Sequence, residues 1–120
     1  MIRFTFRCAR TAVLQYTDNV GTMYFMKRVR FEWDRRKNAN NFKKHSVTFA
    51  EAQSVFCDEL AVEFYDVTHS EREDRFLLLG LSLSLRVLLV CYCQRGEGSV
   101  IRIISARKAT TKERGFYPGG

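Results

Sequence analysis

The sequence predicts an α+β domain in which two helices pack on an antiparallel sheet of about four to five strands, followed by a short carboxy-terminal helix. Two consecutive segments after residue 33 have helix caps and helical apolar spacing. After residue 60, segments that alternate apolar and polar residues are separated by short turns, which is typical of hairpin-connected strands. A chain of 120 residues, 46% of them hydrophobic, is long enough for one core, so we expect one folded domain.

The first patterned segment is a strand followed directly by a helix. Residues 29–33 place Val, Phe and Trp on one side and Arg and Glu on the other, the period of a strand. Asp34 is a favourable N-cap residue for a helix that extends to about Lys44. In this helix Ala39 and Phe42 form the predicted apolar stripe, while the basic side chains stay in solvent.

A second helix follows a short break. Thr48, with Glu51 three residues later, has the spacing of a capping box, in which each side chain bonds the backbone N–H of the other residue. Apolar residues then recur on one helical face, which is expected to pack against the sheet. These residues are Phe49, Ala52, Val55 and Phe56.

The second half of the chain is predicted to be a meander of strands closed by a helix. The strands are expected at residues 60–66, 75–81, 86–95 and 99–105, with polar turns at 66–74 and 96–98. The apolar run at residues 76–93 has the length of a membrane span, but Arg86 and the small residues within it favour two strands. Thr110 or Thr111 is expected to cap the terminal helix.

The first 28 residues do not share this pattern. Clear strand periodicity begins near Val29, and Met23 and Met26 lie just before it. We therefore predict that residues 1–28 are an extension, either disordered or preceding the natural start, and that the folded domain spans residues 29–117. The extension lacks the continuous apolar core of a secretory signal.

Composition favours a polyanionic or acidic partner. Lys and Arg number 20 against 13 Asp and Glu, which gives a formal charge of +7. The four cysteines form neither a CxxC pair nor an evenly spaced framework, so we expect free thiols, no disulfides and a cytoplasmic location. Two separate histidines without a carboxylate cluster predict no metal site, and no cofactor motif is present.

Arginines at strand ends are the first candidates for binding a phosphate. Guanidinium groups bind phosphate oxygens in pairs, and neighbouring strands of a meander can bring such groups to one face of the sheet. The alternative is that they cover the sheet or pair with Glu63, Glu73 or Asp74. The candidates are Arg75, Arg86, Arg102 and Arg107.

His69 is the candidate proton-transfer group. It lies in a polar turn, with Asp66 three residues earlier and Glu73 close by to orient it or accept a proton. With the arginines it would supply what metal-free RNA cleavage needs, and the alternative is an exposed turn histidine. His45 ends the first helix, where stabilisation of the helix terminus is the favoured role and catalysis is the alternative.

The stretch FEWDRRKNANNFKKHSVTFAEAQSVFCD, residues 31–58, resembles the opening of BrnT toxins. Further similarity follows at Asp66, His69, Arg75, Gly80 and Arg86, in the block IRIISARKAT at 101–110, and at Glu113 and Tyr117. This resemblance covers residues 29–117. It implies a RelE-like fold and a metal-independent endoribonuclease toxin of a type II toxin–antitoxin system, which cleaves RNA, inhibits translation and growth, and is neutralised by a BrnA-like antitoxin. It also implies that operator DNA is bound only through the complex with the antitoxin.

Transferred to this chain, the resemblance implies two overlapping sets of site residues. The catalytic set is His69, Arg75, Arg86, Arg102, Asp66 and Glu73. The phosphate-binding set is Arg75, Arg86, Arg102, Arg107 and Lys108. Two other functions stay open from sequence: a catalytically inactive homologue that binds antitoxin and acts as a corepressor module, and a plain nucleic-acid binder that uses charge alone.

Overall fold

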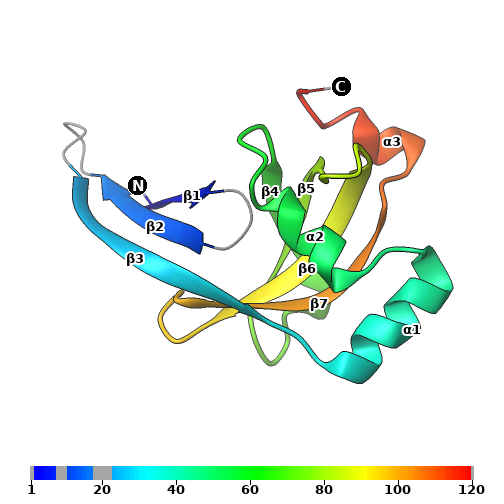
Figure 1. The fold of residues 1–120 in the computed structure, drawn as a ribbon, viewed down its shortest axis with the longest axis horizontal. Helices are drawn as coiled ribbons and strands as arrows, with labels where there is room; N and C mark the ends of the chain where they lie inside the picture. Colours follow the sequence, from blue (N-terminus) through cyan, green and yellow to red (C-terminus); the bar gives the residue numbers. More distant parts are fainter. Residues whose placement is uncertain (1, 8–10, 18–22, 120) are drawn as a thin grey trace.

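The computed structural model describes residues 2–7, 11–17 and 23–119 and shows an α+β fold with a seven-stranded sheet (Figure 1). The elements in chain order are β1 (Ile2–Arg7), β2 (Thr11–Thr17), β3 (Met23–Glu32), α1 (Arg35–His45), α2 (Phe49–Val55), β4 (Val62–Tyr65), the 3-10 turn η1 (Val67–His69), β5 (Arg75–Leu81), β6 (Val87–Arg95), β7 (Val100–Lys108) and α3 (Thr111–Arg114). Across the sheet the strand order is β1-β2-β3-β7-β6-β5-β4. The predicted α+β class, with two helices before a meander and a short terminal helix, is confirmed.

One strand pairing differs from the predicted antiparallel sheet. Strands β4 to β7 are antiparallel neighbours, but β3 runs parallel to β7, with Phe31 opposite Ile101. Parallel partners need a long connection, and here the helices and the rest of the meander supply it. The periodicity of one strand does not encode the direction of its neighbour, so the sequence pattern missed this pair.

Part of the predicted extension forms strands. β1 pairs with β2, and β2 pairs with β3, in antiparallel register. Residues 1, 8–10 and 18–22 lie outside the described residues. The natural start of the chain and the domain boundary at residue 29 stay predictions, and the intact mass of the native protein tests the first of them.

Helix α1 begins as predicted but packs through a different residue. Asp34 accepts a hydrogen bond from the backbone N–H of Lys37 at 3.0 Å. The predicted apolar stripe is wrong, because Ala39 is exposed and the Phe42 side chain lies largely in solvent, at 53% exposure. Asn41 is the buried residue of this helix instead.

The Asn41 amide connects α1 to β7. Its Nδ2 donates to the carbonyl oxygens of Val47 at 2.8 Å and Ala106 at 2.7 Å, and its Oδ1 accepts from the Ala106 N–H at 3.1 Å. A buried amide with its groups satisfied is compatible with a packed interior. The connection therefore fixes where α1 ends relative to the sheet.

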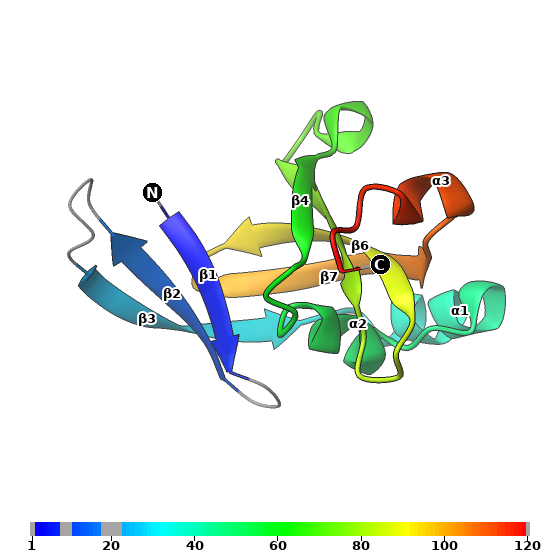
Figure 2. The same cartoon turned by 90° about the horizontal axis from the view of Figure 1, so that it is seen from above.

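Helix α2 supplies the apolar layer over the sheet. Figure 2 shows α1 and α2 on one side of β6 and β7, with α3 on the other side. The helical face predicted from sequence is buried as expected. Its partners in the core include Leu88, Val90 and Tyr92 from β6 and Ile101 and Ile103 from β7. In the part of the chain that the structure describes, no helix is long and apolar enough to cross a membrane.

The two expected caps differ in how they close. Thr48 accepts from the N–H of Glu51 at 3.1 Å, but the Glu51 carboxylate turns to Ser82 and Arg86 instead of returning to the cap. The reciprocal capping box occurs at α3, between Thr110 and Glu113. At α2 the Glu51 carboxylate therefore bonds to the charged Arg86 side chain and not, as predicted, to the backbone N–H of Thr48.

Candidate active site

The sheet face opposite α1 and α2 carries the candidate site, because the strand register lines up polar and apolar rows there. Arg75 pairs with Cys93, which pairs with Arg102. The next rows are Leu77, Cys91 and Ser105, then Leu79, Leu89 and Arg107. Residues directly opposite each other in neighbouring strands share a face of the sheet. Two predicted arginines of β7 therefore share a face with Arg75.

A β-bulge makes this arrangement possible. Between Cys91 and Tyr92 on β6 the partner shifts by two residues on β7, from Ser105 to Ile103. Ile104 is the additional residue, and a bulge of this kind changes which face the following side chains occupy. Without it, Arg102 and Arg107, five residues apart, would lie on opposite faces.

A cleft of about 470 Å³ opens on this face. Its walls come from the end of α1, the turn after β4, the start of β5, the end of β7 and α3. The lining residues are His45, Asp66, His69, Arg75, Leu77, Leu89, Cys91, Ile104, Ser105, Ala106, Arg107 and Glu113. Of the predicted catalytic set, the structure brings His69, Asp66 and Arg75 together here.

Asp66 and His69 form a hydrogen-bonded pair in the cleft wall. The Nδ1 of His69 lies 3.1 Å from the Asp66 Oδ2, within the turn η1. The Asp66 side chain is buried, at 10% exposure, whereas that of His69 is 63% exposed. Because the carboxylate contacts Nδ1, the other ring nitrogen is left for a ligand.

The pair is fixed to the start of β5. The Asp66 N–H donates to the Arg75 carbonyl at 2.9 Å, and the Arg75 N–H donates to the Ser70 hydroxyl at 3.0 Å. Asp66 and Ser70, which lie before and within the turn, are thus both bonded to the backbone of Arg75 at the start of β5. This explains how a surface turn can present a defined imidazole.

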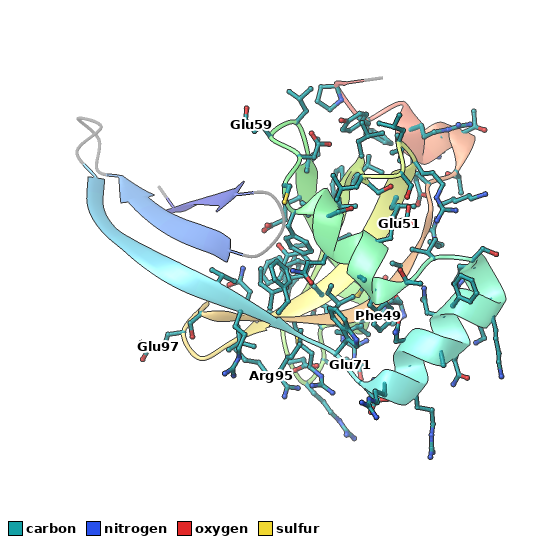
Figure 3. All side chains as sticks on the ribbon, in the orientation of Figure 1. Phe49, Glu51, Glu59, Glu71, Arg95 and Glu97 are labelled. Atoms are coloured by element: carbon teal, nitrogen blue, oxygen red, sulfur yellow. The ribbon has the colours of Figure 1, made fainter. Side chains whose placement is uncertain are left out.

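Arg75 has a polar atom without a partner. Its Nε is buried and has no hydrogen-bond acceptor among the described residues. Its Nη2 lies 3.8 Å from Glu73, which also lies 3.5 Å from Arg95, at the end of β6 in Figure 3. Leaving a buried donor unpaired costs about 1–3 kcal/mol, so the Arg75 guanidinium is incompletely satisfied by the fold.

A second hollow adjoins the cleft through His69 and Arg75. It measures about 560 Å³ and is lined by Thr68, His69, Glu71, Arg72, Glu73 and Arg75. Glu73 therefore lies beside the cleft, in contact with Arg75, and does not line it. Arg75 and His69 thus line both hollows.

Arg107 lies in the cleft with both guanidinium arms occupied. Its Nη1 and Nη2 donate to the two carboxylate oxygens of Glu113 at 2.7 and 2.8 Å. The hydrogen bonds from Arg107 lower the pKa of Glu113 to about 2. Lys108 follows Arg107 on the strand and faces the other side, where its charge helps to lower the pKa of Glu51. Arg107 and Lys108 are therefore separated by the sheet.

Two other predicted arginines lie outside the cleft. Arg86 donates through Nε to Glu51 Oε2 at 3.0 Å and through Nη2 to the Ser46 carbonyl at 3.0 Å, on the helix-covered side. Figure 3 shows Glu51 on α2. Arg102 shares the sheet face of the cleft but pairs with Glu32 on β3 at 3.3 Å. The geometry gives Arg86 a role in attaching α2 to the sheet.

The cleft also contains residues that the sequence patterns did not assign to it. His45 ends α1 and lines the cleft, while the αL residue Ser46 forms the helix C-cap. Cys91 lies in the floor, where burial raises the pKa of its thiol to about 11 and so keeps it protonated. Among the described residues no group of three or more His, Cys, Asp or Glu side chains could hold a metal ion.

Comparisons with known proteins agree with the fold. Residues 33–113 match the family model described as the ribonuclease toxin, BrnT, of type II toxin–antitoxin systems. The crystal structure of the Brucella abortus ribonuclease toxin, BrnT, is similar with a TM-score of 0.55 and 24% identity, covering 69% of this chain and 99% of that one. No curated protein sequence matches the chain. Since the family model spans more than half of the residues, the chain belongs to the BrnT family of ribonuclease toxins of type II toxin–antitoxin systems.

Proposed function

We propose that this chain is a metal-independent endoribonuclease that cleaves RNA in the cleft around His69 and Arg75. Membership of the family gives the general function, a ribonuclease toxin with an RNA substrate and an antitoxin partner. The observation that carries the proposal is the meeting of the Asp66–His69 pair and the Arg75 side chain in one cleft, where the Nη2 of Arg75 lies 3.8 Å from Glu73. A phosphodiester in the cleft would give the Arg75 guanidinium an acceptor beside an imidazole.

The chemistry is an internal transfer of the phosphoryl group. The 2′-hydroxyl loses its proton and its oxygen bonds to the adjacent phosphorus, while the bond from phosphorus to the 5′-oxygen breaks and that oxygen gains a proton. The products are a 2′,3′-cyclic phosphate and a 5′-hydroxyl. His69 moves one of these protons, Asp66 orients its ring, and Arg75 stabilises the charge on the phosphorane oxygens.

The remaining charged residues have supporting roles in this proposal. Arg107 lines the cleft and presents its guanidinium in an orientation fixed by Glu113. Arg102 extends the same sheet face toward β3, so it binds a neighbouring phosphate when the substrate replaces Glu32. Glu73 holds Arg75 from the adjoining hollow. Arg86 and Lys108 are not part of the proposed site.

The proposed partner is a BrnA-like antitoxin. The formal charge of +7 suits both an RNA and an acidic protein segment. We further propose that operator DNA is contacted only through the complex with that antitoxin, and that the toxin acts in the cytoplasm. Co-expression with the neighbouring open reading frame, followed by purification of the complex, tests the partner directly.

Cleavage by the purified protein tests the enzymatic function. Labelled RNA is incubated with EDTA-treated protein, and the product ends are identified by their sensitivity to cyclic phosphodiesterase and polynucleotide kinase. We expect cyclic phosphate ends, and a loss of about 100–1000-fold in Arg75→Ala, the magnitude found when one charge-stabilising donor is removed. Arg36→Ala, which removes one exposed positive charge from α1, should stay within about threefold of wild type.

The same assay separates the enzyme from its main alternative. Arg102 and Arg107 are both paired with carboxylates, as a non-catalytic antitoxin-binding and corepressor module would allow. That alternative requires a folded protein that binds antitoxin and leaves RNA intact at every protein concentration. It also requires expression without antitoxin to leave growth unchanged, whereas the enzyme arrests growth and Arg75→Ala abolishes the arrest.

A further inference from the structure

Both histidines of the chain line the same cleft. The sequence contains only two, His45 and His69, and they are separated by 24 positions. One comes from the last turn of α1 and the other from the turn after β4. The fold nevertheless brings both side chains to the cleft that holds Arg75 and Arg107.

The position of His45 is fixed by the structure around it. Asn41, one helical turn earlier, bonds to the backbone of Val47 and Ala106. The Ser46 N–H closes the helix on the Phe42 carbonyl at 2.8 Å. The end of α1 is thus attached to β7 next to the cleft, although the His45 imidazole makes no hydrogen bond or ion pair with the described residues.

The other titratable groups in the cleft are already engaged. The Glu113 carboxylate accepts from Arg107 through both oxygens and also from the Thr110 N–H at 2.8 Å. Asp66 is bonded to His69. Burial keeps the Cys91 thiol protonated, as its raised pKa shows. Among the described residues of the lining, the His45 imidazole is therefore the group left to transfer a second proton.

We propose that His45 is the second proton-transfer residue of the cleft and acts as a pair with His69. This inference rests on the proposed cleavage of RNA. One imidazole takes the proton of the 2′-hydroxyl as that oxygen bonds to phosphorus. The other, as imidazolium, gives its proton to the 5′-oxygen as the bond from phosphorus to that oxygen breaks, so the protons balance and no metal takes part.

Four charged groups line the cleft with this imidazole pair, and Glu71, Arg72 and Glu73 border His69 from the adjoining hollow. Asp66 and Arg75 approach from the β4–β5 side, and Arg107 and Glu113 from β7 and α3. Arg107 and Glu113 neutralise each other within hydrogen-bond distance. A bell-shaped dependence of the cleavage rate on pH is expected from the pair, and replacing either histidine should remove one limb.

The test compares His45→Ala and His69→Ala on two RNAs of one sequence. In the first the scissile linkage is natural, and in the second its 5′-oxygen is replaced by sulfur, a leaving group that needs no proton. On natural RNA each variant should lose about 100- to 10,000-fold in single-turnover rate, while affinity for uncleavable 2′-O-methyl RNA changes less than threefold. On the thio-substituted RNA, the variant that lacks the acid should recover toward wild type and the other should not.

Matched variants separate chemistry from folding. Asn40→Ala, at an exposed position of the same helix, should cleave like wild type, and His45→Gln should unfold in urea like wild type while remaining inactive. A His45→Ala rate within threefold of wild type, with His69→Ala inactive, would overturn the inference and leave the proposed function intact. If the cleavage rate on the thio-substituted RNA recovered in both histidine variants, or in neither, the assignment of one histidine as acid and the other as base would also be overturned. Absence of cleavage by the wild-type protein would instead overturn the proposed function, and this inference with it.

Discussion

Arg86 on the helix-covered side of the sheet and Arg75 on the cleft side differ in how their guanidinium groups are satisfied. Arg86 donates to both oxygens of Glu51 and to the Ser46 carbonyl. Arg75 has a buried Nε without an acceptor and only a distant carboxylate, at 3.8 Å. Fully paired polar groups stabilise a fold, whereas an incompletely paired guanidinium that lines a cleft is available to a ligand. Pairing therefore distinguishes Arg86, which we assign to the fold, from Arg75, which we assign to the proposed site.

The largest expected effect concerns the cleft side. His69→Ala removes the imidazole that Asp66 orients, so the RNA cleavage rate should fall by about 100- to 10,000-fold with little change in RNA affinity. Val67→Ala, at an exposed position of the same turn, is the matched control. Single-turnover kinetics and equilibrium binding of uncleavable RNA measure the two quantities. Equal losses of rate and affinity would show that His69 contributes binding only.

The next effect concerns the helix-covered side. Asn41→Leu leaves the Val47 carbonyl and both backbone groups of Ala106 without their partners. The free energy of unfolding should fall by about 3 kcal/mol or more, because three groups lose their partners and each buried unpaired group costs about 1–3 kcal/mol. Urea denaturation measures it, with exposed Asn40→Ala expected within about 0.5 kcal/mol of wild type. A loss below about 0.5 kcal/mol in Asn41→Leu would contradict the role of Asn41 in attaching α1 to β7.

Arg86→Met tests the arginine comparison through stability. The substitution keeps the aliphatic stem and removes the partner of Glu51, whose side chain is largely buried, at 14% exposure. A loss of about 1–3 kcal/mol in the free energy of unfolding is expected. Cleavage per folded molecule should be unchanged, as measured in buffer far below the unfolding midpoint. Loss of cleavage without loss of stability would place Arg86 in the site after all.

The smallest effect is a dependence on pH of the contact between α3 and the sheet. Arg107 lowers the pKa of Glu113 to about 2, below the value of 4.5 that applies when the chain is unfolded. A lowered carboxyl pKa contributes stability above about pH 4.5, and this contribution is lost as the pH falls toward 2. NMR signals of α3 should report this loss, and Glu113→Gln should abolish the pH dependence. An unchanged pH dependence in Glu113→Gln would assign it to another group.

Local signals in the sequence predicted much of the fold. The caps at Asp34 and Thr110 act within one helical turn, so the residue type at the helix start is sufficient to predict a cap. The same local signal predicted a capping box at Thr48 and Glu51, but the reciprocal box formed at Thr110 and Glu113 instead. The meander strands follow from a period of two. The pairing of Asp66 with His69 is equally local, since only three residues separate them.

The differences between prediction and structure arise from contacts between distant segments. The parallel pairing of β3 with β7, the bulge at Ile104 and the placement of His45 in the cleft all depend on such contacts. The helical spacing predicted that Phe42 is buried, but Asn41 is buried instead, because its side-chain amide bonds to the backbone of β7. Neither spacing nor hydrophobicity encodes such partners.

Observation of the two guanidinium groups by ¹⁵N NMR tests the comparison most directly. The Nε–H signals of Arg75 and Arg86 are assigned by substitution and followed while 2′-O-methyl RNA is added. If the cleft binds phosphate, the Arg75 signal shifts and saturates with the RNA, while the Arg86 signal, held by Glu51, stays in place. Saturable RNA binding that shifts Arg86 and leaves Arg75 unchanged would contradict the assignment of the site.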